Sequence, residues 1–262
     1  MTDRDLRELL RFAHQLLDET DAIVTRHAVT DLHVERKPDM TLVSAADLEV
    51  EAHLRERITK RFSNHGFLGE EHGEDRGDGE TRWIVDPIDG THNFIRGIDV
   101  YATLLAVERE GRLVLGAVSA PALGRRWAAA TGLGASLRTA GGERPIHVSR
   151  VSRLADAQLC TSGWRQLADG GLLPGWQRAV GRAWRDRGFG DFWGHMLVAQ
   201  GAAEAMVEHG VKPWDLAAPA AIVVEAGGRM TDLQGRDSWN GPGALTTNRA
   251  LHDELLQTLL DS

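Results

Sequence analysis

The sequence predicts a mixed α/β fold of the α+β type, built in two halves that meet at about residue 140. Leucine and alanine recur at helical spacing over the first 27 residues, which predicts an amphipathic helix. Two apolar runs joined through Glu110 and Gly111 predict a β-hairpin in the first half. In the second half, short apolar runs alternate with helical segments. The polar stretch 136–150 lies between these patterns, so we expect halves of about 1–140 and 141–262.

Two helices and an extended segment open the first half. The apolar face expected for residues 1–27 consists of Leu6, Leu9, Leu10, Ala13, Leu16 and Leu17. An extended segment follows over 32–44 and contains Pro38. Ser44 then has Asp47 three residues on, which is typical of a helix capping box. Apolar residues at four-residue spacing continue this second helix to Phe62.

The rest of the chain is expected to form short strands and helices around an acidic loop. That loop spans 64–82 and leads to a short apolar strand that ends at Asp86, followed by the turn PIDGTHNF. The elements expected in the second half are a strand near 157–161, helices near 172–184 and 191–203, a strand over 203–210 and a helix over 214–226. Gly227 and Gly228 are expected to end that last helix, because glycine commonly follows a helix C-terminus.

The composition excludes several classes of protein. The chain has 262 residues, of which 42% are hydrophobic, so it can bury a substantial core. Its formal net charge of −8 disfavours nucleic-acid and anionic-membrane partners, which bind clustered Lys and Arg. The charged N-terminus is unlike a signal peptide, and no apolar run approaches the roughly 20 residues of a membrane span. We therefore expect a cytoplasmic protein, with its one cysteine, Cys160, as a small buried hydrophobe.

Three acidic segments stand at the ends of predicted elements: GEE at 69–71, DPIDGTHN at 86–93 and WDLAAP at 214–219. Asp86 ends a strand and Asp89 follows after a proline, so both carboxylates can face one crevice and hold a hard cation such as Mg²⁺. Gly90 and Thr91 can open a helix, whose N–H groups bind anions. A cation site beside a phosphate site is the arrangement that metal-assisted phosphoryl transfer requires.

Simpler interpretations of the same residues stay open at this point. Asp, Pro and Gly all favour turns, and an acidic loop segment such as GEE is commonly only solvated. Asp47, Asp191 and Asp215 each stand where an aspartate can cap a helix N-terminus. Three histidines are expected at the surface or in packing: His72, His195 and His209.

Together the segments resemble the inositol monophosphatase superfamily. The family pattern is GEE, then a strand with DPIDGTxNF, then WDxAAxxxIVxEAGG, and this chain has GEE, WIVDPIDGTHNF and WDLAAPAAIVVEAGG in that order. Ser44 stands where the family often has threonine, and Pro219 interrupts the helix after Asp215. The resemblance spans nearly the whole chain. It implies one catalytic unit folded as a layered α-β-α-β-α sandwich, with an antiparallel sheet in the first half, a mixed sheet in the second and the active site between them. It also implies a homodimer.

The resemblance implies a set of metal ligands. Glu70, Asp86 and the backbone carbonyl of Ile88 would bind one ion. Asp86, Asp89 and Asp215 would bind a second, and Glu70 would hold a third through water. Two or three Mg²⁺ ions per active site are therefore expected.

The resemblance also implies catalytic and phosphate-binding roles. Thr91, paired with Asp47, is expected to orient the attacking water, so the expected catalytic residues are Glu70, Thr91 and Asp47. Backbone N–H groups of Gly90 and Thr91 would bind the phosphate. The expected substrate contacts around the phosphate are Ile88, Asp89, Gly90, Thr91 and Asp215.

The segment RGFGDFWGHMLVAQGAAEAMVEHG points to one branch of the superfamily. Inositol monophosphatases usually have a small hydroxyl residue where this chain has Asp191, and GDF resembles the histidinol-phosphate phosphatase branch. Arg187 and Glu208 match substrate-contacting positions of the family. Asp191 and Glu208 would be charge-assisted partners for the ammonium and imidazole groups of the substrate.

The resemblance therefore implies Mg²⁺-dependent hydrolysis of L-histidinol phosphate in histidine biosynthesis. The alternative is an inositol-1-phosphate phosphatase or a promiscuous phosphatase of small metabolites. Sugar bisphosphatases and nucleotide 3′-phosphatases of the superfamily are more distant rivals. A metal-binding scaffold without activity is a rival of another class. A scaffold, however, has no need of all five retained residues, which are Glu70, Asp86, Asp89, Thr91 and Asp215.

Overall fold

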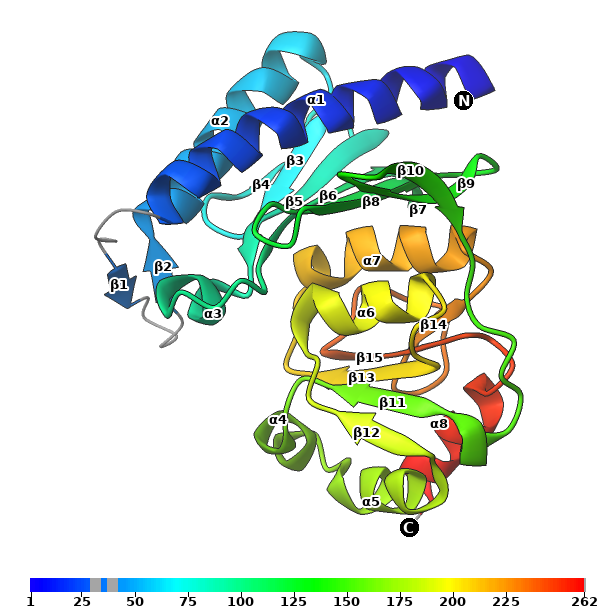
Figure 1. Ribbon diagram of the computed structural model, residues 1–262. Coiled ribbons are helices and arrows are strands. Elements are labelled where there is room, and N and C mark those ends of the chain that lie inside the picture. The colour runs from blue at the N-terminus through cyan, green and yellow to red at the C-terminus, as the bar shows by residue number, and fades with distance from the viewer. Residues whose placement is uncertain (29–33, 37–41, 262) are drawn as a thin grey trace.

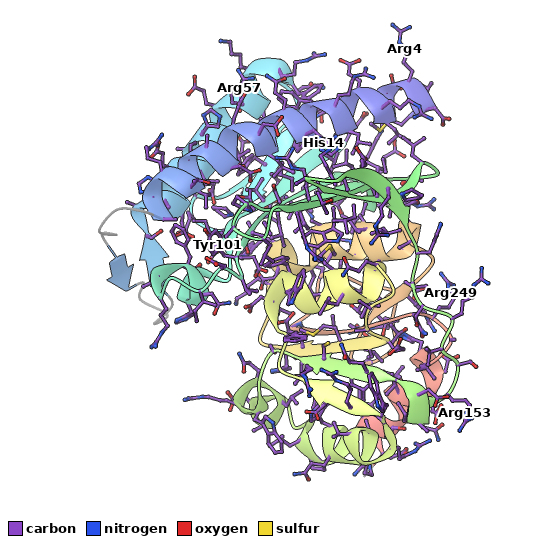
Figure 2. The ribbon with its side chains drawn as sticks, in the orientation of Figure 1. Arg4, His14, Arg57, Tyr101, Arg153 and Arg249 are labelled. Atoms are coloured by element: carbon purple, nitrogen blue, oxygen red, sulfur yellow. The ribbon has the colours of Figure 1, made fainter. Side chains whose placement is uncertain are left out.

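The computed structural model describes residues 1–28, 34–36 and 42–261 of the chain. Helices and sheets alternate in five layers, which Figure 1 shows from top to bottom. A pair of long helices, an eight-stranded sheet, a second pair of helices, a five-stranded sheet and an outer group of helices follow one another. The predicted α-β-α-β-α sandwich is therefore confirmed, and Figure 2 shows side chains filling the space between the layers.

The first layer consists of α1 (Asp3–Ala28) and α2 (Ala45–Arg61), which cover the outer face of the larger sheet. Leu16 of α1 and Leu54 of α2 are fully buried in one core with that sheet. The capping box is confirmed, because the Asp47 carboxylate accepts a hydrogen bond from Ser44 N at 2.8 Å while the Ser44 hydroxyl caps Asp47 N. The predicted extended segment contains β1 (Val34–Arg36) and β2 (Leu42–Ser44), which pair antiparallel; Pro38 lies outside the described residues.

The larger sheet has the strand order β10-β9-β8-β7-β6-β5-β3-β4 and is antiparallel except for the parallel pair β3 and β5. Its strands are β3 (Gly66–Gly69), β4 (Gly73–Asp75), β5 (Thr81–Asp89), β6 (Ala102–Arg109), β7 (Arg112–Ala120), β8 (Arg125–Ala130), β9 (Gly134–Thr139) and β10 (Gly142–Ile146). The predicted hairpin joins β6 to β7 through Glu110 and Gly111, which both have positive φ values, 50° and 77°.

Two segments of this sheet differ from the sequence-based expectation. The acidic stretch 64–82, expected as a loop, contains β3 and β4, and the polar stretch 136–150 contains β10 and much of β9. Residue 140, where the halves were expected to meet, lies in the turn between β9 and β10. The edge strands β4 and β10 are largely exposed and rich in Gly, Glu and Arg. Such strands lack the apolar alternation by which buried strands are predicted.

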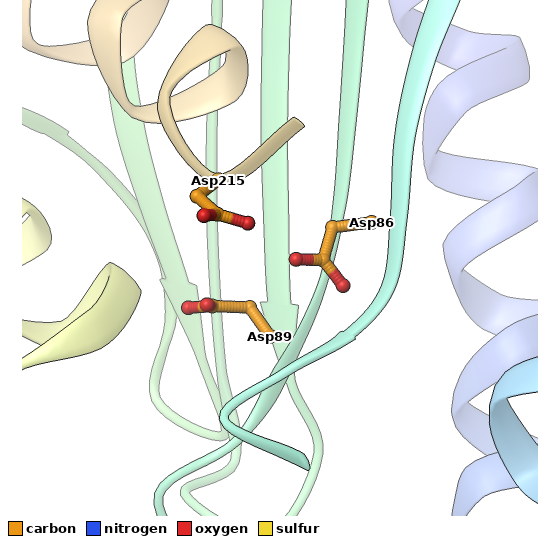
Figure 3. A group of neighbouring side chains, drawn as sticks. All are labelled: Asp86, Asp89 and Asp215. Atoms are coloured by element: carbon orange, nitrogen blue, oxygen red, sulfur yellow. The ribbon is translucent and has the colours of Figure 1, made fainter. Parts of the chain in front are cut away.

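The middle layer consists of α6 (Asp191–Ala199) and α7 (Pro213–Glu225), which lie between the two sheets. Helix α7 lies very close to β7, because a Cβ at Gly116 would be 2.4 Å from the Ala218 carbonyl oxygen. The start of α7 consequently lies beside the end of β5, as Figure 3 shows. Pro219 lies inside α7, and the helix ends as predicted, with Gly227 in the left-handed region at φ 91°.

The second sheet is mixed and has the strand order β12-β11-β13-β15-β14. Its strands are β11 (Gln158–Thr161), β12 (Arg185–Arg187), β13 (Ala205–His209), β14 (Arg229–Asp232) and β15 (Gly243–Thr247). The remaining helices are α3 (Thr91–Ile95), η1 (Leu154–Asp156), α4 (Trp164–Asp169), α5 (Leu173–Arg182) and α8 (His252–Leu260). Helices α5 and α8 share a core with this sheet, and Cys160 of β11 is fully buried as expected. In the described part of the chain, no helix has the length and apolar character that crossing a membrane demands.

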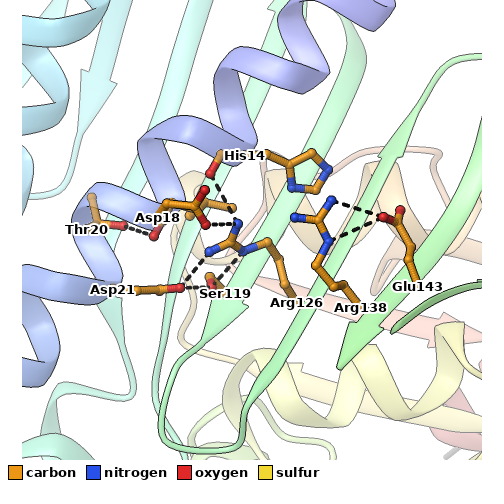
Figure 4. Close-up of polar contacts among 9 residues, drawn as sticks. His14, Asp18, Thr20, Asp21, Ser119, Arg126, Arg138 and Glu143 are labelled. Atoms are coloured by element: carbon orange, nitrogen blue, oxygen red, sulfur yellow. Dashed lines mark hydrogen bonds and ion pairs between the residues drawn. The ribbon is translucent and has the colours of Figure 1, made fainter. Parts of the chain in front are cut away.

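A buried arginine ties α1 to the sheet beneath it (Figure 4). Arg126 of β8 is only 7% exposed, and its guanidinium donates to Asp18 at 2.7 Å and to Asp21 at 2.6 Å. It also donates to the Ser119 hydroxyl at 3.1 Å and to the His14 carbonyl oxygen at 3.1 Å. Burial raises the pKa of Asp21, and the charge of Arg126 opposes that rise. Removing Arg126 would therefore leave the Asp21 carboxylate buried without a counter-charge.

We expect Arg126→Met to lower the free energy of unfolding by about 2–4 kcal/mol at neutral pH, because it leaves Asp21 without its counter-charge. Urea unfolding followed by circular dichroism measures this loss. Arg125→Met is the matched control. Arg125 is the neighbouring arginine, and its guanidinium lies over the Trp193 ring, 5.4 Å from the centroid, rather than between the α1 aspartates. Equal losses in the two variants would contradict the role given to Arg126.

Candidate active site

A bulge in β5 brings two aspartates to the same side of the sheet. Asp86 pairs with Leu104 and Asp89 pairs with Ala102, so β5 has one more residue than β6 between these pairs. Residues three apart in a regular strand point to opposite faces, and one extra residue turns the second side chain back to the face of the first. Both carboxylates are buried, at 2% and 8% exposure. The DPID segment is therefore more than a plain turn.

Asp215 meets these two carboxylates from the first turn of α7 (Figure 3). One oxygen of each of the three aspartates lies within 4.8 Å of one oxygen of the other two. Backbone N–H groups hold two of them, since Phe192 N donates to Asp89 at 2.6 Å and Lys212 N donates to Asp215 at 2.7 Å. Oδ1 of Asp86 is buried and accepts no hydrogen bond from the described residues.

The electrostatics of this cluster call for a cation. Burial raises the pKa of Asp86 well above its ordinary value, and the charges of Glu70, Asp89 and Asp215 raise it further. Burial and the charges of Asp191 and Asp215 likewise raise the pKa of Asp89. Burial raises the pKa of Asp215 to about 7, against the hydrogen bond from Lys212 N. An all-oxygen set with a buried acceptor that lacks a donor fits a hard divalent ion.

A cavity of about 220 Å³ opens beside the cluster and collects most of the predicted residues. The predicted residues in its lining are Glu70, Asp86, Ile88, Asp89, Gly90, Thr91, Asp191, Glu208 and Asp215. Asp47 and Arg187 are not part of the lining. Arg187 lies on β12 with an exposed side chain that donates to the Asp186 carbonyl oxygen at 2.6 Å. Its contact with a substrate stays a prediction.

Glu70 reaches the cavity because β3 and β5 are parallel neighbours, so their C-terminal ends lie at one edge of the sheet. Glu70 follows β3 directly, and its charge raises the pKa of Asp86. Glu70 of the GEE segment is thus part of the cavity lining and not merely a solvated loop residue.

The segment after Asp89 forms the start of α3. Gly90 has φ 82°, and a Cβ there would be 2.9 Å from the Val100 carbonyl oxygen, so a larger residue is excluded. The Thr91 hydroxyl donates to the Ile88 carbonyl oxygen at 2.9 Å. That carbonyl was expected as a metal ligand, and its second lone pair is still available for one.

Asp47 lies fully buried at the start of α2, where its carboxylate accepts hydrogen bonds from the Ser44 amide and hydroxyl. The capping interpretation of Asp47 is therefore confirmed. Its pairing with Thr91 stays a prediction.

Two further acidic side chains face the cavity beyond the aspartate cluster. Asp191 has φ 55°, a rare value outside glycine, and its carboxylate accepts from Asn93 Nδ2 at 3.3 Å. Gly190, not Asp191, is the N-cap of α6, so the alternative interpretation of Asp191 as a helix cap is wrong. Burial and the charge of Glu208 raise the pKa of Asp191 to about 6.

The comparisons with known proteins agree with this site. The sequence model of the inositol monophosphatase family matches residues 5–262 of this chain. The chain belongs to this family. It is 43% identical to the histidinol-phosphatase of Streptomyces coelicolor, over 96% of this chain and 97% of that protein. It is 42% identical to the histidinol-phosphatase of Mycobacterium tuberculosis, over 95% and 97%. The structure of the extragenic suppressor protein suhB of Bartonella henselae superposes with a TM-score of 0.90 at 28% identity, covering 97% of this chain and 99% of that one.

One residue that the sequence analysis did not single out, Glu51, holds the turn that follows Glu70 in this inositol monophosphatase family member. Glu51 of α2 is fully buried, and its carboxylate accepts from Glu71 N at 2.7 Å and His72 N at 2.9 Å. A Cβ at Gly69 would collide with it. The sequence offered one indication of this role, because Glu51 directly follows the apolar Val50 in the second predicted helix. The cavity lining also includes His92, Gln166 and His209, to which no role was given.

We expect Mg²⁺ to stabilise the protein more as pH rises. The fold raises the pKa values of the clustered aspartates, so the metal-free protein favours their protonated forms and loses stability as pH rises through about 7. Mg²⁺ binds the ionised forms and removes this loss. At about 100 times its Kd it should stabilise by about 2.7 kcal/mol near pH 8, which is a rise in Tm of about 5–10 °C.

Thermal unfolding with MgCl₂, and with NaCl at matched ionic strength, measures this effect. The rise should be much smaller near about pH 5, where the aspartates hold protons. An equal Mg²⁺ effect at both pH values would contradict the coupling of metal binding to these carboxylates.

Proposed function

We propose that this protein is a Mg²⁺-dependent phosphomonoesterase that hydrolyses L-histidinol phosphate to L-histidinol and phosphate. The observation that carries the choice of substrate is the pair Asp191 and Glu208, which line the same cavity as the aspartate cluster. Histidinol has an ammonium group and an imidazole, and both can donate charge-assisted hydrogen bonds to carboxylates. The 43% and 42% identity with two proteins named histidinol-phosphatase supports the same choice.

Asp86, Asp89, Asp215 and Glu70, with the Ile88 carbonyl, would hold two or three Mg²⁺ ions. When bound, Mg²⁺ neutralises charge on the phosphate and lowers the pKa of water. The N–H groups of Gly90 and Thr91 bind phosphate oxygens.

Thr91 positions the attacking water. Its hydroxyl proton points to the Ile88 carbonyl oxygen, so the Thr91 oxygen can only accept a hydrogen bond from the water. Glu70 takes the other proton as general base. The bond from water oxygen to phosphorus forms and the bond from phosphorus to the histidinol oxygen breaks. The histidinol oxygen takes a proton from a water molecule, and the resulting hydroxide takes the proton held by Glu70.

Inositol-1-phosphate is the alternative substrate, and the cavity offers it less. Its leaving alcohol carries no positive charge, so it gains no charge-assisted bond from Asp191 or Glu208 while their carboxylates lose water. A promiscuous phosphatase of small metabolites is the other alternative. The homodimer and the cytoplasmic location stay predictions.

We expect Asp191→Asn to lower kcat/KM for histidinol phosphate by about ten- to a hundredfold, the loss of one charge-assisted bond of about 1.5–3 kcal/mol. Activity on p-nitrophenyl phosphate should change much less, because the variant keeps every member of the aspartate cluster and the Phe192 amide that holds Asp89. Phosphate release from both substrates measures the difference. Asp186→Asn is the control, since Asp186 lies nearby on β12 outside the cavity lining. A wild-type preference for inositol-1-phosphate would overturn the assignment.

We expect Thr91→Ala to lower kcat by about a hundredfold or more with a smaller change in KM, because the variant loses the acceptor that orients water. Thr91→Ser keeps the hydroxyl and should retain most activity. Steady-state kinetics at saturating Mg²⁺ measures both variants. A rise in KM alone would mean that Thr91 binds substrate rather than orients water.

A further inference from the structure

A chain of three buried side chains lies behind the acidic end of the cavity. Glu208 of β13 is 4% exposed and lines the cavity, while His195 of α6 and Thr246 of β15 are fully buried behind it. His195 Nε2 lies 3.0 Å from a Glu208 carboxylate oxygen, and His195 Nδ1 lies 2.8 Å from the Thr246 hydroxyl. Both ring nitrogens of the histidine are therefore engaged. His195 was expected only at the surface or in packing.

The proton positions in this chain follow from its chemistry. An ionised carboxylate can only accept, so His195 Nε2 must carry a hydrogen when Glu208 is charged. In a neutral imidazole Nδ1 then accepts, and the Thr246 hydroxyl is the group that donates to it. The opposite tautomer would place an unprotonated Nε2 against Glu208 and would require a neutral carboxylic acid. Because a hydroxyl can donate as well as accept, Thr246 satisfies Nδ1 in the tautomer that a charged Glu208 requires.

The same contact fixes the direction of Glu208. His195 holds one carboxylate oxygen from the protein side, so the carboxylate can present the other oxygen to a ligand in the cavity. Asp191 lines the same cavity as Glu208, and burial together with the charge of Glu208 raises the pKa of Asp191. Without the His195 contact, Glu208 would lose a hydrogen bond inside the protein, and its rotamer would no longer be set.

We propose that His195, supported by Thr246, is a positioning residue that holds one oxygen of the Glu208 carboxylate and turns the other toward the cavity, and that it thereby favours substrates whose leaving alcohol carries a positive charge. This inference rests on the proposed function. His195 acts through Glu208 and does not itself touch the reacting atoms.

Strand β15 offers a matched control for this role. Thr247 follows Thr246 and therefore points to the opposite face of the sheet, where its hydroxyl lies 2.9 Å from Nδ1 of His252. His252 is also buried, and its Nε2 lies 3.1 Å from the Thr231 hydroxyl. This second threonine–histidine contact is of the same kind, but neither Thr247 nor His252 lines the cavity.

The test compares two replacements of the histidine. His195→Gln puts an amide donor near the position of Nε2 and can still bond Glu208. His195→Asn puts its amide near Nδ1, next to Thr246, and cannot reach Glu208. The readout is the kcat/KM for histidinol phosphate divided by that for p-nitrophenyl phosphate. We expect His195→Asn to lower this ratio about tenfold and His195→Gln to lower it by about threefold or less, as for the loss or retention of one hydrogen bond to a charged group.

Threonine variants keep the test decisive if a histidine variant fails to fold. Thr246→Val should lower the ratio about threefold, whereas Thr247→Val should leave it unchanged even if it lowers Tm equally. Inhibition by the product L-histidinol should weaken in parallel in His195→Asn and Thr246→Val.

A wild-type preference for histidinol phosphate that His195→Asn and Thr246→Val leave intact would overturn this inference alone. Equal losses on both substrates would do the same, because they would show a structural role. A wild-type enzyme without that preference would overturn the proposed function and this inference with it.

Discussion

Mutual repulsion among buried carboxylates is the constraint on which this structure depends. The larger sheet supplies Asp86 and Asp89, the middle helical layer supplies Asp215 and the second sheet supplies Glu208. Separately none of these layers would hold such a charge density, so hydrophobic cores on both sides of α7 must fix them together. Without a cation the repulsion among these carboxylates destabilises the fold. A bound cation would neutralise them and link the layers that supply them. Folding and metal binding are therefore expected to be linked in this protein.

The sequence predicted the parts of the site that local chemistry determines. The capping box at Ser44, the helix start at Gly90 and the acidic character of Asp86 and Asp215 all follow from short segments. The strand expected to end at Asp86 instead continues to Asp89, because the bulge keeps Asp89 paired with Ala102. Three features do not follow, because they depend on distant partners. Glu51 is meaningful only with the Glu71 amide beside it, and His195 only with Glu208 and Thr246. The exposed edge strands β4 and β10 are stabilised by their neighbours rather than by their own composition.

Asp191 shows how backbone strain and recognition coincide. A left-handed backbone conformation costs a non-glycine residue free energy, and such residues gather at binding sites. The bond from Asn93 joins Asp191 to α3, so the acidic end of the cavity is connected to the segment that follows Gly90. The neighbouring Phe192 amide holds Asp89. One short stretch at the start of α6 thus carries Asp191 and also orients Asp89, so the proposed substrate contact and the proposed metal ligand share one support.

The close contact between Gly116 and α7 has a consequence for how such a protein can adapt to heat. Enlarging core side chains is a common route to higher thermal stability, but a single added carbon at Gly116 would meet the Ala218 carbonyl at 2.4 Å. Relieving that collision would push α7 away from the larger sheet toward the second one and would carry Asp215 away from Asp86. Larger side chains at the contact between β7 and α7 are therefore excluded as a source of thermal stability. Stabilising changes are expected elsewhere, for example as ion pairs on α1 and α2 or as shorter surface loops.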